Sequence, residues 1–216
     1  MSTMVDRALH ERLWDENQDL ARACLDHPFV RGLGDGSLPA EVFGRYVAQD
    51  VYYLEAFFRA YALAAARCEG RHSAAVAFHR LMGGVLQELE MHAGHAAELG
   101  LDLGAVRPHP ATTAYIELLL EVAWQRGLGP TIAVMTPCMR LYAFLGRELA
   151  ACLRPGHPYR EWIETYSSPE AEELAGTLET MLDELAEDDP EVHRLYRRAM
   201  ECELAFFAAP FDELDA

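Results

Sequence analysis

The chain has 216 residues, 51% of them hydrophobic, and its 35 acidic and 18 basic side chains give a formal net charge of -17. This composition supplies a sizeable core, and so acidic a surface argues against nucleic acid or an anionic membrane as a partner. The five cysteines include no CxxC pair, which argues against a disulfide framework and a thiolate zinc site. No signal core and no run of roughly twenty apolar residues stands out, so we expect a cytoplasmic protein.

Taken in chain order, apolar spacing and turn residues predict helices and no strands, because period-two alternation is absent. The predicted helices cover residues 5–24, 39–68, 72–99 and 112–125, a segment around Cys138 that follows a turn at 127–130, and residues 159–166, 169–186 and 190–207. Short turns separate these segments, and no repeat of fixed period is present. The sequence therefore predicts a single all-α domain, a helical bundle, over residues 1–216.

Turn and capping residues define the expected boundaries. His27 and Pro28 are expected to end the first helix, and the glycine-rich stretch RGLGDGSLP is typical of a connector. Ser37 is expected to cap the next helix. Ser168 and Asp189 each precede a proline and a glutamate, which predicts an N-cap, an N1 proline and a first-turn acid at both helices.

The segment MTPCMRLYAFLGREL, residues 135–149, puts a thiol on an inward helix face. Pro137 cannot donate an amide hydrogen, so we expect a free carbonyl and a locally open helix there. Cys138 and Tyr142 are four residues apart and share a face, and Met135 and Leu145 continue the apolar stripe. The thiol and phenol could line a pocket, although a buried structural cysteine is the commoner explanation.

A lone acid stands on an aromatic helix face. Tyr46, Asp50, Tyr53 and Phe57 are spaced four, three and four residues apart. An ionised carboxylate among aromatic rings is costly unless it is paired. Asp50 therefore either binds an aminated heterocycle in an aromatic pocket, or bonds to a buried tyrosine or faces a subunit interface.

A second acid stands near the end of the chain, where Glu203 precedes Phe206 and Phe207 by about one turn. In a semi-apolar cavity such a carboxyl group would have a raised pKa and could donate or accept a proton. Glu201 lies nearby. From these residues alone, a surface position is the favoured interpretation for both acids.

Four residues in the third predicted helix, Glu88, Glu90, His92 and His95, suggest metal ligands. Di-iron bundles use Glu-x-x-His on facing helices. The one such pair here, at residues 69–72, crosses a glycine loop and has no second copy. A metal site is therefore the less favoured interpretation, and no residue stands out as a haem ligand.

Four segments stand in order along the chain. They are HPFVRGLGDGSLP with its continuation YVAQDVYYL, then TAY at 113–115, then TPCMRLYAFLG, and finally WIETYSSPE with the ELAFF ending. Together they span from about His27 to Phe207. They resemble the thiaminase II (TenA) family of thiamin salvage enzymes. Because Cys138 is present, the chain resembles the Cys-containing group of that family.

The resemblance implies an all-α bundle of the haem-oxygenase-like fold, assembled as a homotetramer, without metal or cofactor. It implies hydrolysis of 4-amino-5-aminomethyl-2-methylpyrimidine and, more slowly, cleavage of thiamin at its methylene bridge. Both reactions would give 4-amino-5-hydroxymethyl-2-methylpyrimidine. The expected partner is therefore a small-molecule aminopyrimidine or thiamin.

The resemblance also implies roles for individual residues. Cys138 is similar to the family's nucleophile, which adds to the pyrimidine ring and labilises the leaving group. Glu203 is similar to the acid/base residue that protonates that group or activates water, and Asp50 would bind the ring nitrogen and amino edge. The residues expected to line the ring or stack on it are Tyr53, Tyr115, Tyr142, Tyr166 and Phe206.

Two other functions stay open at this point. One is an oxidase on the same bundle, which would depend on a metal or on O2 and would tolerate loss of Cys138. The other is a non-catalytic protein that binds a pyrimidine or thiamin. A DNA-binding regulator is disfavoured because the net charge is -17.

Overall fold

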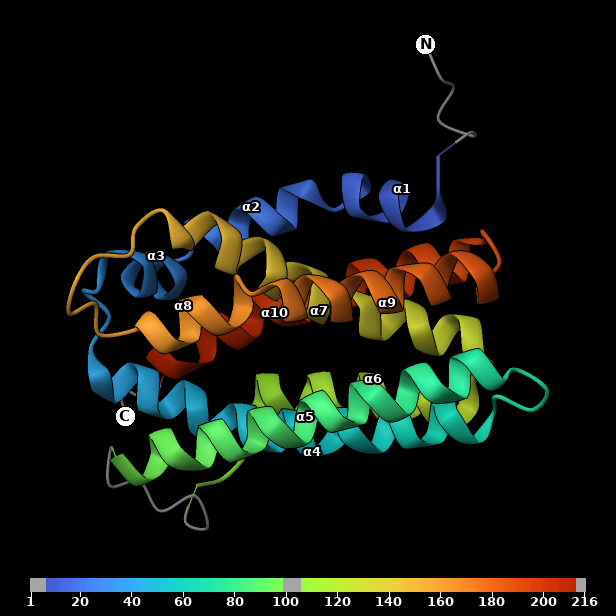
Figure 1. Cartoon of the computed structure of the whole chain (residues 1–216), viewed down its shortest axis with the longest axis horizontal. Helices are drawn as coiled ribbons and strands as arrows, with labels where there is room; N and C mark the ends of the chain where they lie inside the picture. The colour runs from blue at the N-terminus through green and yellow to red at the C-terminus, as the bar shows by residue number, and fades with distance from the viewer. Residues whose placement is uncertain (1–6, 99–105, 213–216) are drawn as a thin grey trace.

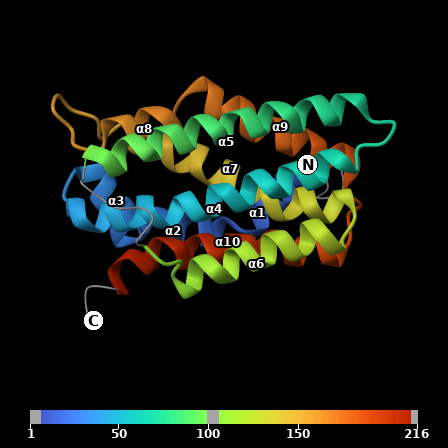
Figure 2. The ribbon, with the colours of Figure 1, turned by 90° about the horizontal axis from the view of Figure 1, so that it is seen from below.

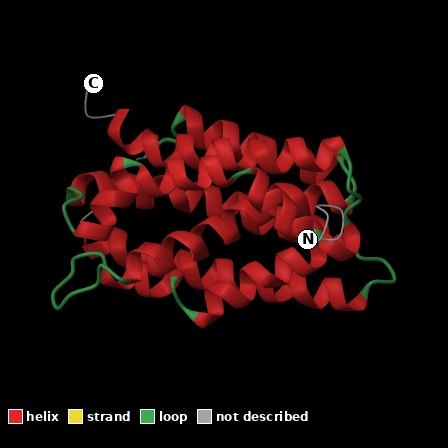
Figure 3. Cartoon of the chain, turned by 90° about the horizontal axis from the view of Figure 1, so that it is seen from above, coloured by secondary structure: helices red, strands yellow, loops and turns green. Residues whose placement is uncertain are grey.

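The computed structural model describes residues 7–98 and 106–212. Within those ranges every regular element is a helix, and no strand is present (Figure 3). The helices are α1 Leu9–Glu16, α2 Gln18–Asp26, α3 Pro28–Asp35, α4 Ala40–Ala66, α5 His72–Glu98, α6 Pro110–Gln125, α7 Leu128–Ala150, α8 Arg160–Tyr166, α9 Pro169–Leu185 and α10 Pro190–Asp212. The all-α prediction is confirmed.

The long helices form a bundle along the long axis of the molecule. Figure 1 shows α4, α5 and α6 on one side, α1 and α2 on the opposite side, and α7, α9 and α10 between them. Seen from below, α4 lies between α5 and α6 (Figure 2), and it contacts both. Helix α7 contacts α9 and α10 and is the central element of the bundle.

Helix α7 corrects one sequence expectation. By length and composition, Leu128–Ala150 is apolar enough to cross a membrane, although no such run was expected. However, 72% of its most apolar window is buried inside the fold. The apolar character of α7 is therefore explained by its central place among the other helices. Pro137 lies inside this helix without ending it, and the free carbonyl expected there stays a prediction.

The predicted helix over residues 5–24 is two helices, α1 and α2. They meet at Asn17, whose side-chain Nδ2 donates to the carbonyl oxygen of Leu13 at 2.8 Å. An asparagine side chain that bonds to the backbone competes with helix continuation. The start of the predicted helix, residues 5 and 6, lies outside the described residues, as does residue 99 at the end of the third predicted helix.

The stretch predicted as a connector contains helix α3. His27 is its N-cap, and its Nδ1 accepts a hydrogen bond from the Phe29 N–H at 3.2 Å. Phe29 and Leu33 are fully buried, so tertiary packing overrides the low helix propensity of the glycines. The left-handed Gly36, with φ 80°, ends the helix. Ser37 does not cap α4, which begins after Pro39.

The two N-caps predicted near the C-terminal end are confirmed. The Ser168 hydroxyl accepts from the Ala171 N–H at 3.1 Å, and a carboxylate oxygen of Asp189 accepts from the Glu191 and Val192 N–H groups. The last helix extends beyond the predicted end at residue 207 and continues through Pro210 to Asp212.

Helices α7 and α8 approach to backbone contact at Gly146. A Cβ atom added there would lie 2.5 Å from the Tyr166 carbonyl oxygen and 2.6 Å from the Ser167 nitrogen. We expect Gly146→Ala to lower the free energy of unfolding by about 1–3 kcal/mol, because α8 must move away. Urea denaturation would measure this loss. Gly176→Ala is the control, since nothing lies within 4 Å of that position and it should be neutral or stabilising. Equal stability of both variants would contradict the close approach.

Candidate active site

A cavity of about 250 Å³ lies between α4, α5, α7, α8 and α9. Its wall is mostly aromatic and apolar, with a thiol and several acids among the rings. The sequence-predicted residues on this wall are Asp50, Tyr53, Cys138, Tyr142 and Tyr166. The other three, Tyr115, Glu203 and Phe206, are buried near it but do not form its wall. Of the eight candidates, the five on the wall therefore form a surface layer of the cavity, and the other three form a supporting layer.

The thiol of Cys138 is half-buried and opens on this cavity. Burial raises the pKa of the thiol well above its usual value, and the nearby charges of Glu203, Glu88 and Asp50 raise it further, in that order. A thiol in such a site is neutral at pH 7. Cys138 therefore needs a base before its sulfur can act as a nucleophile.

Glu203 is the candidate for that base. Its side chain is buried, and Oε1 accepts a hydrogen bond from the Tyr115 hydroxyl at 2.7 Å. Burial raises the pKa of Glu203 from 4.5 to about 8, although hydrogen bonding to Tyr115 and Cys138 opposes that rise. The surface position favoured from the sequence is therefore wrong for Glu203. Glu201 does face outward, where it pairs with Arg198 at 3.1 Å.

Aromatic rings connect the two layers. The Tyr53 ring lies 4.5 Å from the Tyr115 ring and 6.0 Å from the Phe206 ring, between centroids. The Tyr142 and Tyr166 rings lie 4.8 Å apart in an edge-on arrangement. These contacts hold the tyrosine rings in place, and Tyr53, Tyr142 and Tyr166 present part of their surface to the cavity.

Asp50 is also buried, and two side chains approach its Oδ2. The Tyr46 hydroxyl donates to this oxygen at 3.4 Å, and Nε2 of the fully buried His92 lies 2.8 Å from it. Burial is the largest influence on the pKa of His92 and lowers it, but pairing with Asp50 and the charge of Glu88 outweigh burial, so the pKa is raised. Asp50 thus bonds to a buried tyrosine and also lines the cavity. Two of the alternatives drawn from the sequence, a bond to a buried tyrosine and a place in an aromatic pocket, therefore hold together.

Glu88 lies beside this ion pair. Its Oε1 is 4.0 Å from His92 Nε2, and the Tyr166 hydroxyl donates to the same oxygen. Burial, followed by the charge of Asp50, raises the pKa of Glu88 to about 7. The donor atoms of Asp50, Glu88 and His92 all lie within 4.8 Å of one another, an arrangement that could hold a metal ion. Ligation by His92 would require its imidazole to be neutral.

The other two residues of the sequence-level metal candidate do not join this group. Glu90 is exposed, and His95 Nε2 pairs with Glu161 at 3.0 Å. The third acid next to Glu88 and His92 is instead Asp50, from α4. The prediction that the protein uses no metal stays a prediction.

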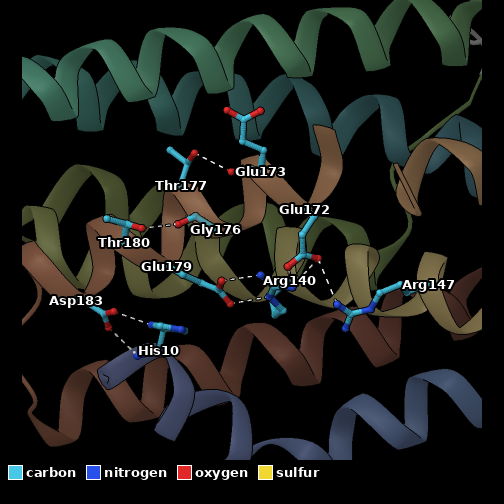
Figure 4. Close-up of polar contacts among 10 residues, drawn as sticks. All are labelled: His10, Arg140, Arg147, Glu172, Glu173, Gly176, Thr177, Glu179, Thr180 and Asp183. Carbon is cyan, nitrogen blue, oxygen red and sulfur yellow. Dashed lines mark hydrogen bonds and ion pairs between the residues drawn. The ribbon is translucent and has the colours of Figure 1, made fainter. Parts of the chain in front are cut away.

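The cavity wall next to Cys138 is supported from behind by Arg140. Its guanidinium donates to both carboxylate oxygens of Glu179 at 2.6 Å and to Glu172 at 2.8 Å, which ties α7 to α9 (Figure 4). Such a bidentate pair is among the stronger charged contacts. Met139, by contrast, lines the cavity. Of the two residues that follow the thiol, Met139 is therefore the one that a ligand in this cavity would contact.

Residues 14–212 match the TENA/THI-4/PQQC family. The chain belongs to this family. The family predicted from the four sequence segments is thereby confirmed.

Relatives within the TENA/THI-4/PQQC family are named for enzymes. The aminopyrimidine aminohydrolase of Halalkalibacterium halodurans is 36% identical over 182 residues, covering 81% of this chain and 80% of that protein. The mitochondrial bifunctional TH2 protein of Arabidopsis thaliana is 33% identical over 231 residues, covering 94% of this chain. The aligned part is only 37% of that plant protein, which is therefore much longer.

Solved structures show the same fold. A TenA family transcription regulator from a Silicibacter species has a TM-score of 0.86 and 28% identity, covering 93% of this chain and 95% of that chain. A domain with a heme oxygenase-like fold from Shewanella denitrificans has a TM-score of 0.73 and 14% identity, covering 95% and 93%. The expected haem-oxygenase-like architecture is confirmed.

For this member of the TENA/THI-4/PQQC family, sequence reasoning missed His92 as a partner of Asp50, whereas Tyr46 is the buried tyrosine that one of the alternatives for Asp50 expected. The available signal was the spacing of Glu88 and His92, one turn apart on a single helix face, which also fits a surface ion pair. Only the approach of α4 to α5 shows that His92 is buried against Asp50.

Proposed function

We propose that the protein is a C–N hydrolase of thiamin salvage that acts on aminopyrimidines. It releases ammonia from 4-amino-5-aminomethyl-2-methylpyrimidine and, more slowly, cleaves thiamin at its methylene bridge. The observation that carries this proposal is the placement of a thiol with a buried carboxyl group, Cys138 with Glu203, at a cavity that also holds the separate carboxylate Asp50. The names of the relatives support the same chemistry.

The cavity suits a single flat ring. Its volume of about 250 Å³ is small beside the roughly 300–1,000 Å³ of pockets for drug-sized ligands. Tyr53, Tyr142 and Tyr166 supply ring faces and edges on its wall. Asp50, held by His92, accepts hydrogen bonds from the amino edge of the pyrimidine, which fixes the ring relative to the thiol.

Proton transfer between Glu203 and Cys138 starts the reaction. The Glu203 carboxylate takes the thiol proton while the sulfur bonds to a ring carbon, and the displaced electron pair moves to a ring nitrogen, which takes the proton from Glu203. The exocyclic amino group then pushes electrons toward the methylene carbon, whose C–N bond breaks with both electrons on the leaving nitrogen. Water adds to that carbon, and the C–S bond breaks. The net change converts an ammonium substrate and water into an alcohol and ammonium.

A cytoplasmic location, a homotetrameric assembly and the absence of a cofactor belong to the same proposal. Trp124 on α6 is 66% exposed, and an aromatic surface of this kind is enriched at subunit contacts. Light scattering of the purified protein tests the tetramer.

Ammonia release by the wild-type protein, after treatment with a chelator, tests the proposed function. We expect turnover of the aminomethyl pyrimidine, slower turnover of thiamin, and the hydroxymethyl pyrimidine as the product of both. An oxidase would require O2 or an added metal. A protein that only binds would show a ligand-dependent rise in melting temperature without turnover.

A further inference from the structure

We propose that Glu88 recognises the positive charge of the leaving group, so that the site selects pyrimidines with a cationic substituent on the carbon arm beside the amino edge. This inference rests on the proposed function and adds a specificity residue to it. The two expected substrates share such a charge, as an ammonium in one and a thiazolium in the other. Their common product, an alcohol, has none.

Asp50 and Glu88 differ in solvent exposure, and this difference indicates different roles for the two acids. The Asp50 side chain is 5% exposed, whereas the Glu88 side chain is 23% exposed, and both lie on the cavity wall. Asp50 is enclosed by Tyr46 and His92 and meets only the ring edge that enters the cavity. Glu88 keeps more free surface, which is what a group needs to contact a substituent of the ring.

The hydrogen bonds of Glu88 leave one oxygen for a ligand. Tyr166 donates to Oε1, and His92 approaches the same Oε1. Within residues 7–98 and 106–212, no donor to Oε2 is found. The Tyr166 contact fixes the orientation of the carboxylate, so its second oxygen is available without a large loss of side-chain entropy.

The spacing of the acids matches the substituents of the substrate. The amino group and the carbon arm stand on adjacent ring carbons, and oxygens of Asp50 and Glu88 lie within 4.8 Å of each other. With the amino edge at Asp50, the arm reaches toward Glu88. An ammonium there donates a charge-assisted hydrogen bond, and a thiazolium is attracted by charge alone.

The ring carbon to which the Cys138 sulfur must add agrees with this placement of the arm. Expulsion of the leaving group requires sulfur on the unsubstituted ring carbon next to the carbon that bears the arm. The arm therefore lies between the carbon at Cys138 and the amino edge at Asp50. Cys138, Glu88 and Asp50 all line the same cavity, so one ring can meet the thiol and both acids.

Binding of two ligands to Glu88→Gln tests the inference. Calorimetry would compare the cationic aminomethyl pyrimidine with the neutral hydroxymethyl product. We expect about 10- to 100-fold weaker binding of the cation, the size of one charged hydrogen bond, and product binding within about twofold of wild type. Unchanged product binding also shows that the variant is folded. Glu90→Gln, which removes an exposed acid from the same helix, should bind both ligands normally.

Other outcomes overturn the inference in distinguishable ways. Equal weakening of both ligands would make Glu88 a structural residue, and unchanged binding of the cation would remove it from recognition. Wild-type binding of Mn²⁺ that is lost in Glu88→Gln, together with metal-dependent turnover, would make the group of Asp50, Glu88 and His92 a metal site. Failure of the wild type to bind the product or to release ammonia would instead overturn the proposed function.

Discussion

Cys138→Ala should reduce ammonia release by at least roughly 10³-fold, because removal of a covalent nucleophile leaves only the binding and orientation of the substrate. The thiol is half-buried on a cavity wall, so the variant should fold and still bind the hydroxymethyl product. Single-turnover measurement of ammonia separates the chemical step from product release. The comparison should be made after chelator treatment, so that a metal-dependent reaction is not counted.

Two other cysteines provide matched controls. Cys152→Ala alters an exposed thiol, and Cys202→Ala alters a buried thiol next to Glu203 in the chain. Both should retain near wild-type turnover. If Cys138→Ala keeps more than a tenth of the wild-type rate, the thiol mechanism is wrong, and direct attack of water or the oxidase alternative becomes the better explanation.

Glu203→Gln should lower kcat by roughly 10²- to 10⁴-fold, since it removes a general acid/base without changing the size of the side chain. The pKa of Glu203 is about 8, so its base form becomes dominant only above that pH. We expect wild-type kcat/KM for thiamin to rise with pH, with a midpoint near 8, and the variant to lack this rise. Thiamin is the substrate of choice because its leaving group carries a fixed charge.

The stability of the free protein should change with pH in the opposite direction. Burial raises the pKa of Glu203 from 4.5 to about 8, so the fold favours the neutral carboxyl group. The corresponding stability is fully present below pH 4.5 and is lost as pH rises through 8. Between pH 5 and 8, the free energy of unfolding of the wild type should therefore fall by up to about a few kcal/mol relative to that of Glu203→Gln.

Glu201→Gln is the control for both experiments, because Glu201 pairs with Arg198 on the surface. It should follow the wild-type rate profile and the wild-type dependence of melting temperature on pH. Identical pH profiles for wild type and Glu203→Gln would show that another group is the base that activates Cys138.

Local patterns in the sequence determined the helices and the faces on which the chemical groups stand. The spacing of Cys138 and Tyr142 placed both on one face of α7, and both line the cavity. The aromatic stripe around Asp50 was likewise visible in α4, and Ser168 and Asp189 marked two helix starts. These features depend on residues within a few positions of one another. The family resemblance rested on short segments of the same kind.

Tertiary structure decided which of those faces are covered and which distant groups meet. The pattern in α10 favoured a surface acid, but Tyr115, 88 residues away, approaches Glu203 and encloses it. His92 became a partner of Asp50 only through the contact of α5 with α4. Helix α3 formed in a glycine-rich stretch because Phe29 and Leu33 are buried. Helical periodicity determines the direction of a side chain from its own helix, whereas its burial and its pKa depend on the helices packed against it.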